Sequence, residues 1–221
     1  MTASTRGGSF WVWGLIALLS LGVGGYALFH VFTGFRFVPE SVLKNAFPSP
    51  LGLKIHIGCA GVALILGPFQ FLKRLRAAQP TVHRWMGRIY VAACMLGGLA
   101  GGSIALYSSA GPIAGWGFFM LALLWTPFTA LAWVSAMRRD FVAHERWMIR
   151  SFALTFGAVT LRIYLPIGLA LMGMQGYHDP FTFPYRIIAW AAWVPNLIVA
   201  EAWIRSQPRL RPRRKTAAAT A

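Results

Sequence analysis

The chain has 221 residues, of which 57% are hydrophobic and only 12% are charged, and its mean hydropathy is +0.58. The apolar residues fall in long blocks, a pattern typical of a protein embedded in a lipid bilayer rather than of a soluble domain. The net charge of +16 would indicate nucleic acid in a soluble protein. Here the arginines and lysines stand at the ends of apolar blocks, so we expect no nucleic-acid partner.

Six apolar segments are each long enough to cross a hydrocarbon core of about 30 Å. In chain order they cover residues 9–33, 51–72, 84–108, 112–137, 146–173 and 185–205. The first is too long for the core of a signal peptide, so we interpret it as a retained helix. Asp140 is suited to cap the fifth helix at its start. The sequence therefore predicts an all-α, polytopic membrane bundle of six transmembrane helices.

The distribution of lysine and arginine predicts the direction of these helices. Basic residues gather in the second-to-third connection, in the fourth-to-fifth connection and in the tail. By the positive-inside rule these three regions face the cytoplasm, so both termini are predicted to be cytoplasmic.

We divide the chain into four parts. Residues 1–50 hold the first helix and an outer loop, and residues 51–173 hold a core bundle of helices two to five. Residues 174–206 hold an outer loop and the sixth helix, and residues 207–221 form a basic tail that we expect to be disordered.

One unusual phrase occurs twice, as RWMGR at residues 84–88 and as RWMIR at residues 146–150, each with a histidine just upstream, His83 and His144. The third and fifth helices both enter from the cytoplasm, so the two histidines should lie at similar depth on parallel helices. Interfacial anchoring by tryptophan and arginine would explain the repeat without chemistry. It gives the histidines no role, however, and the deeper arginine of each copy must face protein, water or a counter-ion.

The first functional hypothesis is a b-type haem electron-transfer protein. Imidazoles on two facing helices can take both axial positions of a haem iron, so His83 and His144 are the candidate metal ligands. Arginines would pair with the haem propionates, and the candidates are Arg84, Arg88, Arg146 and Arg150. Lipid phosphate is an alternative anion for them. The redox partner would be a quinone or another protein.

The second hypothesis is a small-molecule binder or carrier with an outer pocket. Arg162 lies about fifteen residues into the fifth helix, roughly 22 Å from its inner end, and His56 lies at a similar depth on the second. An arginine within a membrane is costly and indicates a functional site. Tyr164 and His30 could join this site, and the ligand would be an anion, a lipid, a quinone or a second haem.

Two further polar residues are assigned by depth. Glu201 lies too near the inner end of the sixth helix to reach Arg162 and is better placed to pair with Arg88 or Arg150. Gln70 could bind a ligand at the inner site, although packing would explain it as well. A third hypothesis is a structural accessory subunit without chemistry.

The runs KIHIGCAGVALILGPFQFLKRLRAAQPTVHRWMGRIYV and HERWMIRSFALTFGAVTLRIYLP resemble an uncharacterised family of bacterial membrane proteins, domain of unknown function 2306. The resemblance covers roughly residues 50–170. It implies a multi-pass protein of the bacterial cytoplasmic membrane and brings no activity. The positions that match are His56, Gln70, His83, Arg84, Gly87, Arg88, His144, Trp147, Arg150 and Arg162.

The chain is also distantly similar to cytochrome b561-like haem bundles, in which alternate core helices supply each pair of histidines. His83 and His144 fit one such pair. His56 would need a partner on the fourth helix, which contains no histidine. This similarity therefore implies a single haem, or a site for a quinone or a substrate at His56 and Arg162.

Overall fold

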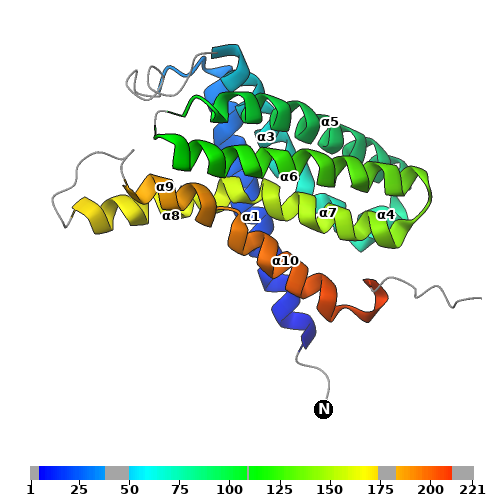
Figure 1. Ribbon diagram of the computed structural model, residues 1–221. Helices are drawn as coiled ribbons and strands as arrows, with labels where there is room; N and C mark the ends of the chain where they lie inside the picture. Colours follow the sequence, from blue (N-terminus) through cyan, green and yellow to red (C-terminus); the bar gives the residue numbers. More distant parts are fainter. Residues whose placement is uncertain (1–4, 38–49, 109, 174–182, 211–221) are drawn as a thin grey trace, which may run out of the picture.

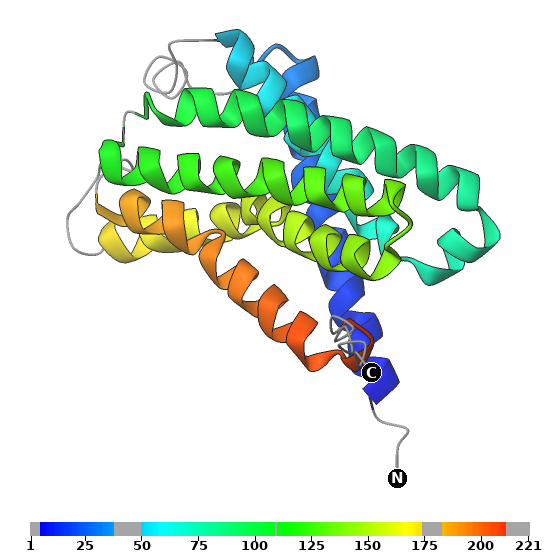
Figure 2. The ribbon, with the colours of Figure 1, turned by 45° about the vertical axis from the view of Figure 1, so that its right-hand side comes forward.

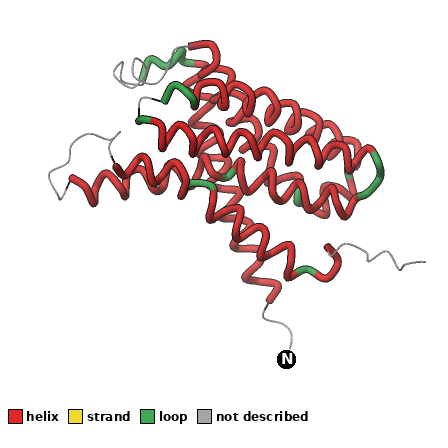
Figure 3. Tube along the Cα trace, in the orientation of Figure 1, coloured by secondary structure: helices red, strands yellow, loops and turns green. Residues whose placement is uncertain are grey.

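The computed structural model describes residues 5–37, 50–108, 110–173 and 183–210 (Figure 1). The described chain is helical with short connections, and no strand occurs in it (Figure 3). Its helices are α1 (Thr5–Phe32), α3 (Pro50–Gln70), α4 (Lys73–Ala78), α5 (Pro80–Ala105), α6 (Pro112–Met137), α7 (Phe141–Thr155), α8 (Gly157–Gly173), α9 (Phe183–Ala191) and α10 (Val194–Ser206). A short 3-10 helix, η1 (Pro208–Leu210), follows.

Six helical segments are long and apolar enough to cross a membrane, which confirms the predicted all-α bundle. They are Phe10–Phe32, Pro50–Gln70, Pro80–Ala105, Pro112–Met137, Phe141–Leu171 and Tyr185–Ser206. Large apolar side chains project from the bundle, and Trp11 and Phe32 are 76% and 84% exposed. Such exposure suits contact with lipid chains and would be unfavourable in water.

The fifth and sixth spans are each broken into two helices, whereas each was predicted as one segment. The fifth breaks at Phe156, between α7 and α8, and the sixth breaks between α9 and α10. The two breaks pack on each other, since a Cβ added to Gly157 would lie 3.3 Å from Cβ of Trp193. Pro195, in the first turn of α10, has no N–H to continue the preceding helix. In Figure 2, α10 turns away from α9 at this point.

The core consists of α3, α5, α6 and α7. Helices α5, α6 and α7 lie side by side, α3 packs on α5, and α1 covers α3 (Figure 1). Small residues allow the close approach, because a Cβ on Gly97 would lie 3.0 Å from Cβ of Cys59. The buried centre of this core includes Tyr90, Cys94, Trp125 and Leu154.

The predicted N-cap is confirmed, because the Asp140 carboxylate accepts a hydrogen bond of 3.0 Å from the Ala143 N–H. The beginning of α1 and the end of α10 lie at the same end of the molecule, as six spans require (Figure 2). We call this the inner end and the opposite end the outer one. That the inner end faces the cytoplasm stays a prediction from the positive-inside rule.

The first residues of the predicted basic tail pack on the bundle. Leu210 of η1 is 2% exposed, and Arg209 forms a salt bridge of 2.6 Å with Glu145 of α7. The remainder of the predicted tail, residues 211–221, lies outside the described residues, as do residues 38–49 and 174–182 of the two predicted outer loops.

Candidate functional site

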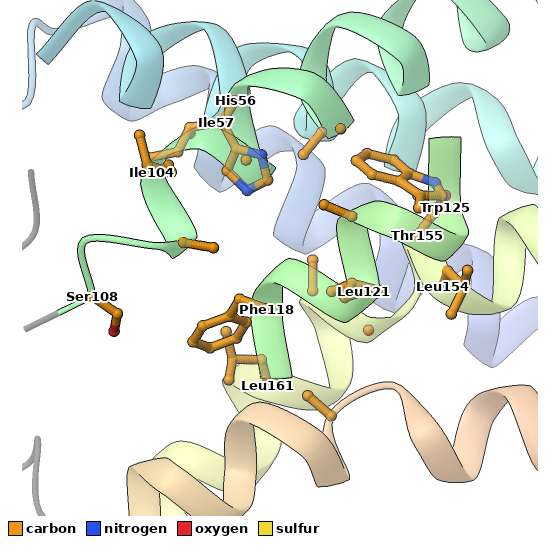
Figure 4. Close-up of a pocket in the computed structure, with 18 of the residues that line it drawn as sticks. His56, Ile57, Ile104, Ser108, Phe118, Leu121, Trp125, Leu154, Thr155 and Leu161 are labelled. Carbon is orange, nitrogen blue, oxygen red and sulfur yellow. The ribbon is translucent and has the colours of Figure 1, made fainter. Parts of the chain in front are cut away.

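A cavity of about 310 Å³ opens in the outer half of the bundle, between α3, α5, α6, α8 and α9. Its lining is mainly apolar, and the aromatic and aliphatic side chains include Ile57, Ile104, Phe118, Leu121, Trp125 and Leu161 (Figure 4). A small set of polar residues shares the lining, namely His56, Ser108, Thr155, Arg162 and Tyr185. An apolar cavity with a few polar groups is the usual form of a small-molecule site.

His56 reaches this cavity because α5 carries glycines opposite it. Its Nδ1 donates a hydrogen bond of 2.8 Å to the carbonyl oxygen of Gly97. A Cβ on Gly101 would lie only 2.6 Å from the same nitrogen, so a larger residue there would displace the ring. A carbonyl oxygen can only accept, so Nδ1 carries a proton, and Nε2 of the neutral ring is an acceptor.

Arg162 comes to the same cavity from α8, as its predicted depth suggested. Its Nη1 donates a hydrogen bond of 2.9 Å to the carbonyl oxygen of Ala158. Among the described residues, no carboxylate lies within salt-bridge distance of Arg162. The guanidinium therefore brings a positive charge to the cavity without a protein counter-ion in the described chain.

Neither Tyr164 nor His30 lines this cavity, although both were predicted as neighbours. Tyr164 is two residues from Arg162, and two residues on a helix point about 200° apart, so it faces elsewhere. His30 is 6% exposed and lies among aromatic rings of its own segment, with the Tyr26 ring 4.3 Å away. Tyr185 occupies the place predicted for Tyr164. The sequence carries no local signal for Tyr185, which begins the last span.

Below the cavity, hydroxyl groups of α5, α6 and α7 form a buried network. Thr155 accepts a 2.9 Å hydrogen bond from Nε1 of Trp125, and the Tyr90 hydroxyl lies 3.0 Å from both Thr155 and Ser151. Thr129 continues the network to Ser151 at 2.6 Å. Hydrogen bonds between helices compensate the polar atoms and fix the helices relative to one another. Trp125 and Thr155 thus give the cavity a rigid floor.

The two histidines of the repeated phrase lie in the inner half. Nδ1 of His144 donates a 2.8 Å hydrogen bond to the carbonyl oxygen of Ala132. His83 lies close enough to His144 for an electrostatic interaction, and its own Nδ1 is buried without a partner. Gln70 does not line the outer cavity. Its Oε1 lies 3.3 Å from the Cβ position of Gly87, one turn from His83.

Both copies of the phrase have the same internal geometry. The Arg88 guanidinium lies 4.7 Å from the centre of the Trp85 ring, and Arg150 lies 4.6 Å from that of Trp147. Their surroundings differ, because Trp85 and Arg88 are exposed whereas Arg150 is 8% exposed. Arg150 binds both carboxylate oxygens of Glu201, which confirms one of the two predicted pairings.

The other two arginines proposed for the haem propionates also differ from each other. Arg84 is exposed and hydrogen-bonds to Thr81 at 3.4 Å. Arg146 is half-buried on α7 and lies near Glu201. The four arginines predicted to serve one haem thus occupy different surroundings, from exposed positions on α5 to the contact between α7 and α10.

The described ranges contain no cluster of three or more histidine, cysteine, aspartate or glutamate residues arranged to hold a metal ion. Cys59 and Cys94 are free, and Cys94 is buried. The described chain therefore offers no set of ligands for a zinc ion. A haem held by two histidines is a different case, since the porphyrin supplies the remaining ligands.

A family model described as "Predicted membrane protein (DUF2306)" matches residues 53–204. Because the match covers more than half of the chain, this protein belongs to that family. Comparisons with curated proteins and with solved structures find no match. The likeness to cytochrome b561-like bundles therefore stays a prediction from the histidine pattern.

Proposed function

We propose that this membrane protein binds a small amphipathic molecule in the outer cavity. The oxygen-bearing head group of the ligand contacts Arg162 and His56, and its apolar body lies between α3, α5 and α6. The observation that carries the proposal is Arg162 in the lining of a mainly apolar cavity of about 310 Å³, with no carboxylate paired to its guanidinium among the described residues.

The energetics of the bilayer support this assignment. An arginine in a membrane helix is costly unless it meets water, a partner or a ligand, so its presence needs a compensating interaction. The cavity volume falls in the range of about 300–1,000 Å³ that is usual for small-molecule sites. The apolar lining selects a ligand that already partitions into the membrane, and the charge selects the head group.

The donors and acceptors define the class of head group. Arg162 presents N–H donors to a carboxylate or to a carbonyl oxygen. Neutral His56 offers Nε2 as an acceptor for a hydroxyl, and its protonated form offers a donor. A fatty-acid-like carboxylate or a quinone carbonyl can accept from Arg162, and also from His56 when its ring is protonated, whereas the hydroxyl of a quinol can donate to Nε2 of the neutral ring. A quinone would connect the cavity with electron transfer, whereas a carboxylate would indicate a binder or carrier.

Binding to protein in nanodiscs tests this proposal, with empty nanodiscs as the blank. Radiolabelled laurate represents the carboxylate class and decylubiquinone the quinone class. Arg162→Gln should weaken binding of the matching probe by about tenfold or more, the loss of one charged hydrogen bond. The matched control is Arg186→Gln, which removes an outer arginine that bonds to the Ala110 carbonyl oxygen and does not line the cavity. Equal affinities for both variants and the parent protein would refute the proposal.

A b-type haem between His83 and His144 is the second candidate function. In its support, the Nδ1 bond of His144 leaves Nε2 for a metal, the arrangement that metal-binding histidines usually have. His83 lies near it with its Nδ1 unpartnered. The two histidines would hold the haem. The haem would supply one-electron chemistry toward a quinone or a redox partner in the bacterial cytoplasmic membrane.

An absorption spectrum of the purified protein, oxidised and after dithionite, tests the haem. Sharp reduced bands that disappear in His83→Ala and His144→Ala but persist in His30→Ala would support it. If the protein is expressed with haem supply and is folded but colourless, the haem hypothesis is excluded. If the cavity also binds neither probe, the third hypothesis of a structural accessory subunit gains support.

A further inference from the structure

One arginine pairs with a carboxylate where α7 meets α10, in the inner half of the bundle, and two further arginines lie near that carboxylate. Arg150 binds Glu201 through Nε and through Nη2, the latter at 3.0 Å. Arg146 and Arg205 lie close enough to the same carboxylate to act on it electrostatically. We call Arg146, Arg150, Arg205 and Glu201 the inner arginine site. Its guanidinium groups outnumber its carboxylate, so it carries an excess of positive charge.

Two donors of this site face no acceptor. Nη1 of Arg150 and Nε of Arg146 are both buried and have no hydrogen-bond partner. The Arg150 side chain is only 10% exposed, and the Trp147 ring covers its guanidinium. Buried polar groups in native proteins are nearly always satisfied, by protein, water or an ion. The combination of excess charge and unsatisfied donors therefore indicates an anion.

The depth of the site indicates where that anion comes from. Arg146 and Arg150 lie five and nine residues after the first residue of α7, roughly 8 and 14 Å along the helix. Arg205 lies in the last turn of α10. The arginines thus extend from the inner end of the span into the bundle, and Arg146 and Arg205, which lie nearer that end, are the ones that a phosphate of the inner leaflet would meet first. Guanidinium groups bind phosphate oxygens in a bidentate manner.

We propose that the inner arginine site binds a phosphate group, on an anionic lipid of the inner leaflet or on a soluble cytoplasmic molecule. Arg146 and Arg205 receive the phosphate, and the unpartnered Nη1 of Arg150 donates to it from below. Glu201 holds Arg150 in position and at the same time opposes the incoming anion. The site is separate from the outer cavity and does not depend on what that cavity binds.

The role of Glu201 gives the test a characteristic sign. Glu201→Gln removes a negative charge beside the anion, so phosphate affinity should rise, on the order of tenfold. Arg146→Gln and Arg205→Gln should each lower it by about tenfold. Arg138→Gln is the matched control, because it removes an exposed inner arginine of the turn between α6 and α7. Arg146 and Arg205 are not fully buried, so both variants should fold.

Two probes separate the sources of phosphate. Native mass spectrometry counts phosphatidylglycerol retained by the protein from mixed micelles with phosphatidylcholine. Inorganic phosphate is titrated against protein in pure phosphatidylcholine nanodiscs, at constant ionic strength. Binding of either probe that follows the expected order of variants supports the site and identifies its source. Affinity that falls in Glu201→Gln, or that falls as much in Arg138→Gln as in Arg146→Gln, overturns the proposal. So does the absence of binding in both arms.

Discussion

Replacing Glu201 with glutamine should destabilise the protein when no anion is supplied. The substitution keeps the shape of the side chain but leaves the Arg150 guanidinium, whose side chain is 10% exposed, without a counter-ion. Breaking a fully buried pair costs about 3–5 kcal/mol. The Glu201 side chain is 31% exposed, so water compensates part of that loss, and the amide oxygen can still accept one hydrogen bond. We therefore expect a loss of about 2 kcal/mol.

The assay is reversible unfolding in neutral bicelles, and a double-mutant cycle isolates the pair. Arg150→Met removes the charge that Glu201 compensates, so the additional loss on Glu201→Gln in that background should be small. A coupling between the two positions of about 1–2 kcal/mol is expected. If Glu201→Gln lowers the free energy of unfolding by less than about 0.5 kcal/mol, or if the coupling is zero, the pair does not stabilise the bundle.

Three further predictions concern the packing. Gly101→Ala should weaken ligand binding in the outer cavity by about tenfold, because its Cβ would lie 2.6 Å from Nδ1 of His56 and displace the ring; dialysis with laurate or decylubiquinone measures it. Gly24→Ala should lower the free energy of unfolding by about 1–3 kcal/mol, because its Cβ would lie 2.9 Å from a backbone oxygen of α3. Gly25→Ala is the control and should be nearly neutral, because no atom lies within 4 Å of its Cβ position. Tyr90→Phe should lower the free energy of unfolding by about 0.5–1.5 kcal/mol, the usual size of a hydrogen bond between membrane helices. An unchanged free energy of unfolding would mean that the hydroxyl network does not stabilise the bundle.

Much of the architecture could be predicted because it depends on properties that are local in the chain. Length and hydropathy determine the six spans, and the N-cap at Asp140 depends only on its neighbours. Depth along a helix is also local, at 1.5 Å per residue. It was sufficient to bring His56 and Arg162 to one cavity and to limit the partner of Glu201 to Arg88 or Arg150, of which the structure has Arg150.

What could not be predicted depends on direction around a helix and on contacts between distant segments. Tyr164 has nearly the depth of Arg162 but points to another side, so depth alone placed it wrongly. No proline lies at the break at Phe156, which occurs where Gly157 packs on Trp193. Pro166, by contrast, lies inside α8 without ending it. Tertiary packing therefore decides where the fifth span breaks, whereas the break of the sixth span lies just before Pro195.

The two copies of the repeated phrase have the same local structure but different surroundings. In each copy the tryptophan and the arginine three residues later face the same side of the helix, so the guanidinium stacks on the ring in both. On α5 that face is exposed at Trp85, where stacking and anchoring at the membrane boundary are sufficient. On α7 the same face meets α10, so Arg150 is buried and requires Glu201. The repeat itself therefore supplies only an arginine anchored on a tryptophan ring. Contact with α10 places the second copy in a charged site, where Nη1 of Arg150 has no hydrogen-bond acceptor.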